Sequence, residues 1–336
     1  MKYVNAKSVL YIFPKCLSEK SIRRIVLNEK KRMEPEKMRV GQIVKEFGVV
    51  GDINQIYTSA WEINHEYVLK KYTDINELQR NVSIISILFR SEVPVPQIVK
   101  LNDGRMYYED EGQYWVLTTK LKGCNVIDIT KCDNEWFYKM GRIIAGLHLA
   151  FDNCEDIISF WNNSLLGEME SWIRKNITES KVSYVDISEL ESVINELKKV
   201  DDKLSRGLIH RDVHLGNFLF DNGQFSGYID FDLSQRNIRI FDICYFMLGL
   251  LLDENEHRVN EKVWFEYLSR VVNGYNSLIQ LSKEERNSIA LVMECIELLF
   301  VAYFIGEQDD KAAKDSAKLY RFCRDNHDKI NGSYIK

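Results

Sequence analysis

The segment from Leu208 to Asp232, LIHRDVHLGNFLFDNGQFSGYIDFD, concentrates side chains that can accept protons or bind metal ions. Asp212 and Asn217 stand five residues apart in it, and Asp230 follows thirteen residues after Asn217. Phosphoryl transfer needs such a set, because it requires a carboxylate near the acceptor hydroxyl and oxygen ligands for Mg²⁺. Carboxylate and amide oxygens are the hard ligands that Mg²⁺ prefers.

A hairpin is expected to bring the two ends of this segment together. FLF and FSGYI have the composition of short strands, and the DNG sequence at Asp221–Gly223 is a good turn. Such a hairpin would return Asp230 to the neighbourhood of Asn217, so that both could bind one ion. The alternative interpretation is a polar loop between two strands without chemistry.

The motif HRDVHLGNFLF followed by YIDFD resembles the catalytic region of the aminoglycoside phosphotransferase and choline kinase family, whose pattern is H-x-D-x-H-x-x-N and then I-D. The resemblance implies a bilobal protein-kinase-like fold. It also implies that Asp212 orients and deprotonates the acceptor hydroxyl, that Asn217 and Asp230 bind Mg²⁺, and that Asp232 is a second acid in the site.

Three further residues take supporting roles by the same resemblance. His210 would hold the loop, and Asp242 at the start of an apolar helix would fix the loop backbone, although an ordinary acid at a helix N-terminus predicts almost the same position. His214 stands where protein kinases usually have Lys. With Asp-Phe-Asp in place of Asp-Phe-Gly and no Ala-Pro-Glu downstream, the motif favours the bacterial small-molecule kinase branch over a protein substrate.

On the nucleotide side, Val68-Leu69-Lys70 resembles the element whose lysine contacts the phosphates, which makes Lys70 the candidate. Strand alternation places Lys70 and Lys71 on opposite faces without saying which faces inward. Gly51 and Asn54 match the family's G-x-x-N-x-x-Y turn over the phosphates, for which a surface turn is the alternative.

The lysine's usual glutamate partner is missing from the following helix. Asn81 occupies the place where that glutamate is often found, so either Glu77, one turn earlier, replaces it or the pair is absent. YWVLTTKLKG resembles the hinge that offers backbone groups to adenine, with Thr119 and Leu121 as candidates. Backbone recognition leaves ATP and GTP equally open.

The first 120 residues predict a small antiparallel sheet with one helix. QIYTSAWEI and EYVLKKY, within Gln55–Tyr72, indicate two strands around Asn64 and His65. TDINELQRNVSIISILFRS has helical spacing and stops before the prolines of VPVP. QIVKL, RMYYE and QYWVLTT indicate three more strands.

Beyond Gly123 the pattern changes to helices, predicted over residues 136–151, 164–175, 187–204 and most of 263–326. The chain is accordingly divided into a helical extension (1–40), a nucleotide-binding N-lobe (41–120) and a helical C-lobe (121–336) that carries the catalytic loop and metal site at 208–232. The expected fold class is α+β, a small antiparallel β lobe with a larger, mainly helical lobe.

Composition excludes several classes of protein. A formal net charge of −5 argues against dedicated nucleic-acid binding, and the seven cysteines show no CxxC pair or zinc spacing, which favours reduced thiols. The apolar run chosen as nearest to a membrane span, Ile243–Leu252, is only ten residues long, and the N-terminus lacks a secretion signal. We therefore expect a cytoplasmic protein without a membrane partner.

Together these features predict a Mg²⁺- and ATP-dependent (or GTP-dependent) phosphotransferase acting on a hydroxyl of a small molecule, such as an aminoglycoside-like antibiotic or an amino alcohol. The alternative is a catalytically weak or inactive kinase-like nucleotide-binding protein with a scaffold or spore-coat role, suggested by Asn81 and by the basic first 40 residues. The identity of the acceptor and the oligomeric state stay open.

Overall fold

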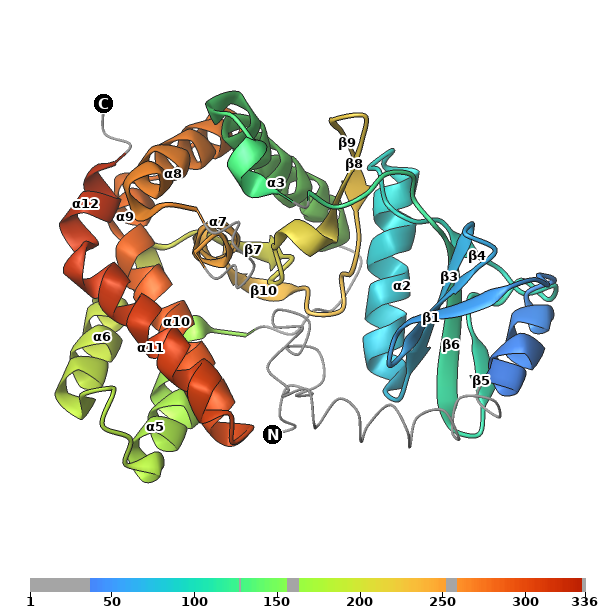
Figure 1. The fold of residues 1–336 in the computed structure, drawn as a ribbon, viewed down its shortest axis with the longest axis horizontal. Coiled ribbons are helices and arrows are strands. Elements are labelled where there is room, and N and C mark those ends of the chain that lie inside the picture. The colour runs from blue at the N-terminus through green and yellow to red at the C-terminus, as the bar shows by residue number, and fades with distance from the viewer. Residues whose placement is uncertain (1–36, 127, 156–162, 252–258, 334–336) are drawn as a thin grey trace. The chain divides into compact units, whose positions relative to one another are not determined.

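The computed structural model describes residues 37–126, 128–155, 163–251 and 259–333 (Figure 1). These residues cluster into two compact units. The first takes in the chain up to Cys124 together with Phe218–Leu233, and the second takes in Asn125–Asn217 and the chain from Ser234 onward. A helical extension was expected over residues 1–40. Residues 1–36 of it, Cys16 among them, lie outside the described residues.

The first unit is built on a six-stranded antiparallel sheet in the order β1-β2-β3-β6-β4, with β5 pairing β6. The strands are β1 Ile53–Tyr57, β2 Ala60–Ile63, β3 Tyr67–Tyr72, β4 Ile98–Val99, β5 Tyr108–Asp110 and β6 Gln113–Thr119. The small antiparallel lobe expected from the sequence is therefore confirmed.

Two tight turns shape its first three strands. Asn64 and His65 both have positive φ, of 52° and 58°, as the predicted hairpin between β2 and β3 requires. The single strand expected over residues 55–63 was wrong, because the chain turns back after Tyr57 and pairs it with Ala60. The short polar pair Thr58-Ser59 makes this turn possible, and strand periodicity alone did not reveal it.

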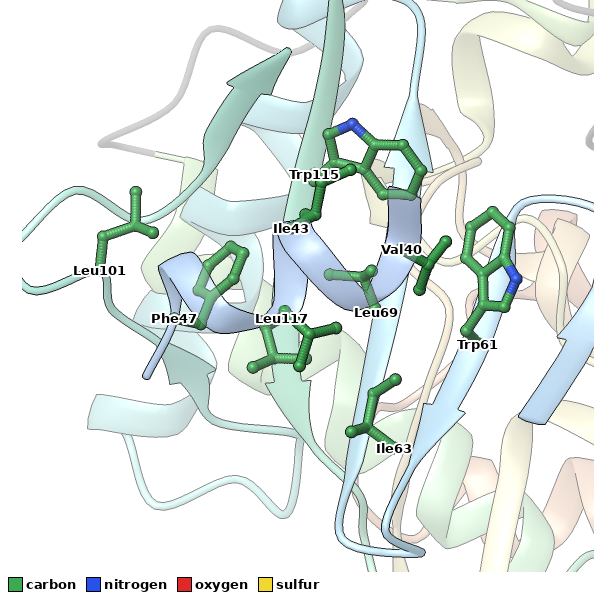
Figure 2. Close-up of a cluster of buried hydrophobic side chains, with 10 residues drawn as sticks. Val40, Ile43, Phe47, Trp61, Ile63, Leu69, Leu101, Trp115 and Leu117 are labelled. Carbon is green, nitrogen blue, oxygen red and sulfur yellow. The ribbon is translucent and has the colours of Figure 1, made fainter. Parts of the chain in front are cut away.

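Helices cover the two faces of this sheet. A helix over residues 37–46 buries Val40, Ile43 and Val44 in one cluster with Trp61, Leu69, Trp115 and Leu117 (Figure 2). Because this helix contributes to the core, the unit begins before residue 41, where the lobe boundary was expected. On the other face, Leu78 and Val82 of α2 (Ile75–Arg90) pack with Tyr72 and Val116.

The predicted hairpin is present as β8 (Phe218–Asp221) and β9 (Gln224–Tyr228), with Phe218 paired to Tyr228. It clusters with the first unit, whereas the sequence placed it in the helical lobe. The reason is its backbone pairing: Phe220 bridges to Cys124, and the Tyr228 amide donates to the Pro94 carbonyl over 2.9 Å.

The second unit is mainly helical. Its α-helices are α3 Asn134–Glu155, α4 Leu165–Glu168, α5 Arg174–Ser180, α6 Ile187–Val200, α7 Ile240–Gly249, α8 Glu261–Asn276, α9 Lys283–Asn287, α10 Ile289–Gly306, α11 Asp310–Asp325 and α12 His327–Gly332. A π-helical turn, Met169–Ile173, joins α4 to α5, so the helix expected over 164–175 is interrupted. The segment expected as mostly helical over 263–326 is divided among α8, α9, α10 and α11.

Two features of this unit were not predicted. Strands β7 (Arg206–Ile209) and β10 (Gln235–Ile238) form a separate antiparallel pair. Helices α3 and α8 approach so closely that a Cβ atom at Gly141 would lie 1.9 Å from the Val271 carbonyl oxygen, and one at Gly274 would lie 2.0 Å from that of Tyr138. Only glycine fits at these two contacts.

Helix α10 is the most apolar helix in the described part of the chain that reaches membrane-spanning length. Its 18 residues have a mean hydropathy of 2.1, but 83% of them are buried inside the fold, as in a core helix. From the sequence, Ile243–Leu252 was chosen as the apolar run nearest to a membrane span. Helix α10 was overlooked, because Glu294 and Glu297 interrupt the apolar sequence of that helix. Both glutamates are fully buried.

The two glutamates of α10 differ in their partners. Glu294 accepts a hydrogen bond from Arg324 over 2.9 Å and lies 2.7 Å from Nδ1 of His327. Neither oxygen of Glu297 has a hydrogen-bond partner within the described ranges. Burial alone raises the pKa of Glu297 well above its ordinary value of 4.5, so the native state keeps this side chain protonated beyond that pH.

We predict that Glu297→Gln stabilises the protein increasingly as pH rises above 4.5. Above that pH the unfolded chain releases a proton that the native state retains. The free energy of unfolding therefore falls by up to about 1.4 kcal/mol per pH unit. Glutamine does not titrate, so the variant lacks this dependence of stability on pH. Urea unfolding between pH 5 and pH 8 measures the difference. The matched control, Glu294→Gln, should destabilise by about 3 kcal/mol because it removes the buried charge that faces Arg324 and His327. A Glu297→Gln variant as unstable as this control would contradict the prediction.

Candidate active site

The candidate catalytic segment, residues 210–217, follows β7, and a buried carboxylate holds its backbone. Asp242, in the first turn of α7, accepts hydrogen bonds from the amide of His210 over 2.8 Å and from that of Arg211 over 2.9 Å. Its Oδ2 atom also lies 2.9 Å from Nε2 of His148, whose Nδ1 lies 2.8 Å from the Tyr275 hydroxyl. Both carboxylate oxygens of Asp242 thus have hydrogen-bond partners, and Asp242 in turn determines the path of residues 210–211.

Arg211 adopts a strained backbone conformation at this point. Its φ is +66°, which is uncommon for a residue with a side chain. One guanidinium nitrogen donates to both carboxylate oxygens of Glu168 over 2.9 Å, and the group lies 5.1 Å above the ring of Phe241. These contacts fix the arginine side chain and so help maintain the turn into Asp212.

Asp212 is 3% exposed and is oriented through both carboxylate oxygens. The Tyr245 hydroxyl donates to Oδ1 over 2.8 Å, and the Asn217 amide donates to Oδ2 over 3.1 Å. Burial would raise the pKa of this carboxyl, but the ring of His214, the charge of His210 and the Tyr245 hydroxyl hold it below its ordinary value. Asp212 is therefore kept ionised in a buried position.

His214 faces this carboxylate with a defined tautomer. Its Nδ1 atom accepts a hydrogen bond from the Gly216 amide over 3.0 Å, so in the neutral ring the proton resides on Nε2. Nε2 lies 3.5 Å from Oδ2 of Asp212. The histidine that distinguished the motif in the sequence thus points toward the candidate catalytic carboxylate.

The side-chain amide of Asn217 includes the oxygen atom expected of a metal ligand. Its amide nitrogen donates to the backbone oxygen of Asp212 over 2.8 Å as well as to the carboxylate. With the nitrogen so engaged, the amide oxygen is the atom that can bind a hard cation. No group of three or more His, Cys, Asp or Glu side chains in the described ranges could hold a metal by itself, as is usual for Mg²⁺ sites completed by water and phosphate oxygens.

In the first unit, Lys70 lies between two carboxylates. Its Nζ atom is 2.9 Å from Oδ1 of Asp230 and 2.8 Å from Oδ2 of Asp232. Burial would lower the pKa of Lys70, but the two carboxylates raise it well above its ordinary value, so the amine stays charged. Asp230 has a φ of +65°, so this candidate, like Arg211, has a strained backbone although it is not glycine.

Strand alternation now explains which lysine of β3 faces inward. Lys70 and Tyr72 share the face covered by α2, and the Tyr72 hydroxyl donates to Oδ1 of Asp232 over 2.9 Å. Lys71 faces the other way, with its Nζ atom 5.5 Å from the ring of Trp61 and 5.6 Å from that of Trp115.

Asn81 and Glu77 of α2 have different surroundings. The Asn81 side chain is 4% exposed and donates to Asp232 and, over 2.9 Å, to the Tyr72 hydroxyl. Within the described residues, Lys70 forms ion pairs with Asp230 and Asp232 and none with Glu77. Burial raises the pKa of Glu77, and the charge of Asp232 adds to that rise. The ion-pair partners of Lys70 in the structure are Asp230 and Asp232, and a role for Glu77 in nucleotide binding stays a prediction.

The candidates near the strand ends have simpler environments. Gly51 has a φ of +153°, and a Cβ atom there would lie 1.8 Å from Oδ1 of Asn64, so this position requires glycine. Asn54 is exposed on β1 rather than placed in a turn. Thr119 ends β6 and exchanges hydrogen bonds with the Gln97 backbone, while Leu121 lies just beyond the strand.

The structure thus gathers the candidates into two groups. Lys70, Asp230 and Asp232 meet in the first unit, and His210, Asp212, His214, Asn217 and Asp242 meet in the second. The two predicted metal ligands fall one in each unit. Sequence reasoning missed Tyr72 and Tyr245; the available signals were that Tyr72 lies two residues after Lys70 on the same face and that Tyr245 lies one turn after Asp242.

Comparison with known proteins finds a family model described as the phosphotransferase enzyme family, which matches residues 53–275. Homoserine kinase from Zymomonas mobilis is 23% identical over 243 residues, or 70% of this chain and 72% of that protein. A solved amicoumacin kinase with AMP-PNP and Ca²⁺ superposes with a TM-score of 0.64 at 16% identity, over 90% of this chain and 96% of the other. The GDP complex of aminoglycoside 2'-phosphotransferase-IIIa gives 0.62 at 15% identity, over 86% and 99%. The expected protein-kinase-like α+β fold is confirmed.

We predict that Asp242→Asn destabilises the protein by about 3 kcal/mol and loosens the catalytic segment. The amide can accept at only one atom, so one buried backbone N–H of residues 210–211 loses its charged partner. Denaturant unfolding measures the stability, and hydrogen exchange at the amides of residues 210 and 211 measures the loosening. Asp221→Asn, at the exposed hairpin turn, should change stability by less than about 0.5 kcal/mol. Unchanged exchange at both amides would contradict the role assigned to Asp242.

Proposed function

Because the chain belongs to the phosphotransferase enzyme family, we propose that it is a Mg²⁺- and ATP-dependent kinase that phosphorylates a hydroxyl group of a small molecule. The observation that carries this proposal is the state of Asp212. This carboxylate is buried, oriented by Tyr245 and Asn217, and held ionised. A carboxylate in that state can accept a hydrogen bond from an acceptor hydroxyl, align it for attack and take its proton.

The metal and the phosphates would be held by the remaining candidates. Asn217 and Asp230 have the oxygen atoms to bind Mg²⁺, and Lys70 is a charged donor suited to phosphate oxygens. When bound, Mg²⁺ neutralises charge that develops on the phosphoryl group. The strained backbone of Asp230, maintained without a glycine, supports a functional role for its orientation.

The acceptor is expected to be a small hydroxylated molecule carrying an amine. The relatives include a homoserine kinase and an amicoumacin kinase, whose names indicate an amino alcohol and an antibiotic as substrates. His214, which faces Asp212, stands where protein kinases usually have lysine. ATP is proposed as donor because the amicoumacin kinase was solved with AMP-PNP, and the GDP complex of the aminoglycoside enzyme makes GTP the donor to test beside it.

The alternative of an inactive scaffold rested on Asn81, which stands where the lysine's glutamate partner is expected, and on the basic first 40 residues. Lys70 nevertheless has two carboxylate partners, Asp230 and Asp232, so the position of Asn81 does not leave the lysine without a counter-ion.

The proposal is tested in two stages. Thermal unfolding with and without Mg-ATP or Mg-GTP measures nucleotide binding; at a nucleotide concentration of 100 times Kd the native state gains about 2.7 kcal/mol. ADP or GDP release is then measured against homoserine, other amino alcohols, aminoglycosides and amicoumacin. No shift with either nucleotide would overturn the proposal.

We predict that Asp212→Asn reduces kcat on the responsive acceptor by about 10²- to 10⁴-fold while leaving Mg-nucleotide binding within a few-fold of wild type. The asparagine preserves the shape of the side chain but cannot take the proton. Steady-state kinetics and calorimetric titration measure the two effects. Asp221→Asn, at the hairpin turn and away from Asp212, is the control and should retain wild-type kinetics. Full turnover by Asp212→Asn would contradict the role of the carboxylate.

A further inference from the structure

The two oxygens of Asp232 are used in different ways. Oδ2 lies 2.8 Å from the Lys70 ammonium, and Oδ1 accepts hydrogen bonds from the Tyr72 hydroxyl and the Asn81 amide. The same Asn81 nitrogen donates to the Tyr72 oxygen over 2.9 Å, which closes a ring of three side chains. Tyr72 and Asn81 are 7% and 4% exposed, so the two donors of this ring are largely shielded from water.

Two of the three side chains of this ring stand on regular elements. Tyr72 is on the same strand and face as Lys70, two residues away, and Asn81 is in the interior of α2. The hydroxyl can donate only once, and its single proton goes to Asp232, while its oxygen accepts from Asn81. This order of donors fixes the side chain of Asp232 in one orientation against the lysine.

Charge explains why the helix carries an amide at this place. Lys70 already faces two carboxylates, which leaves the cluster with one surplus negative charge. A glutamate at position 81 would bring a third carboxylate against Asp232 in a buried environment, where like charges are costly. An amide instead supplies the donor that Asp232 needs.

We infer that Asp232 is the permanent counter-ion of Lys70 in this protein, taking the place of a helix glutamate, and that Asn81 and Tyr72 are positioning residues for it. Asp230 is thereby left free to bind the metal while Lys70 remains oriented. This inference rests on the proposed function. It adds two residues, Asn81 and Tyr72, that affect nucleotide binding through Asp232.

The test moves the carboxylate from one element to the other in the full-length protein. Asn81→Glu alone should weaken binding of Mg-AMP-PNP at least tenfold because it adds the third carboxylate. Asp232→Asn alone should weaken it by a similar factor because it removes the lysine's counter-ion. The double variant carries one carboxylate on the helix and none at position 232, and should recover to within about threefold of wild type.

Calorimetric titration with Mg-AMP-PNP gives the affinities, and steady-state kinetics separates KM for the nucleotide from kcat. We expect the single variants to raise KM for the nucleotide more than they lower kcat. Asn76→Glu makes the same substitution at an exposed position of α2 and should bind as wild type does. If Asn81→Glu also binds as wild type, or if the double variant is no better than the weaker single variant, the inference is overturned.

Two outcomes must be kept distinct. If the wild-type protein binds no Mg-nucleotide, the proposed function fails; if it binds and the exchange does not restore affinity, only this inference fails. Should Asn81→Glu not fold, as judged by its melting curve, Tyr72→Phe tests the same point by removing one oxygen. It should weaken Mg-AMP-PNP binding three- to tenfold, and unchanged affinity would overturn the role of Tyr72 and with it the inference.

Discussion

The carboxylate of Asp242 is the interaction on which the catalytic segment depends. It accepts from two consecutive backbone amides, of His210 and Arg211, and lies within hydrogen-bonding distance of His148. Consecutive amides can point at one carboxylate only if the backbone turns sharply, and Arg211 makes that turn with a φ of +66°. Such a conformation costs about 1–3 kcal/mol. Charge-assisted hydrogen bonds are strong enough to maintain it, so Asp242 sets the direction from which Asp212 leaves the chain.

The same physical rule governs the other buried acids, each of which takes its state from its donors. Asp212 has Tyr245 and Asn217 on its two oxygens and is held ionised. Glu297 has no such donors in the described part of the chain, and its pKa rises through burial. Burial is therefore not what separates the ionised carboxylate of Asp212 from the protonated side chain of Glu297. The difference lies in whether fixed donors replace the water that burial removes.

Most helices and strands were predictable, because they depend on local pattern, and the same pattern selected the candidate site residues, whose roles stay predictions. The hairpin at Asn64 and His65, the helix ending before VPVP, and the strands around DNG all follow from turn chemistry and periodicity. What failed depended on contacts between distant segments. The hairpin β8–β9 joins the first unit through Cys124 and Pro94, and no feature within residues 218–228 could indicate that. Helix α10 was overlooked because charges in a sequence suggest exposure, whereas Arg324 meets one of them inside the fold.

Asn81 shows how one such long-range contact changes the meaning of a residue. Considered within its helix, it is a missing glutamate and favours an inactive protein. Considered with Tyr72 and Asp232, it is a donor required by a carboxylate 151 residues away in sequence. A motif judged position by position cannot distinguish a lost charge from a relocated one, because the total charge around Lys70 is the physical quantity that matters. The three positions must therefore be interpreted together: because Asp232 is acidic and lies beside Lys70, a neutral donor at position 81 is the arrangement that electrostatics favours.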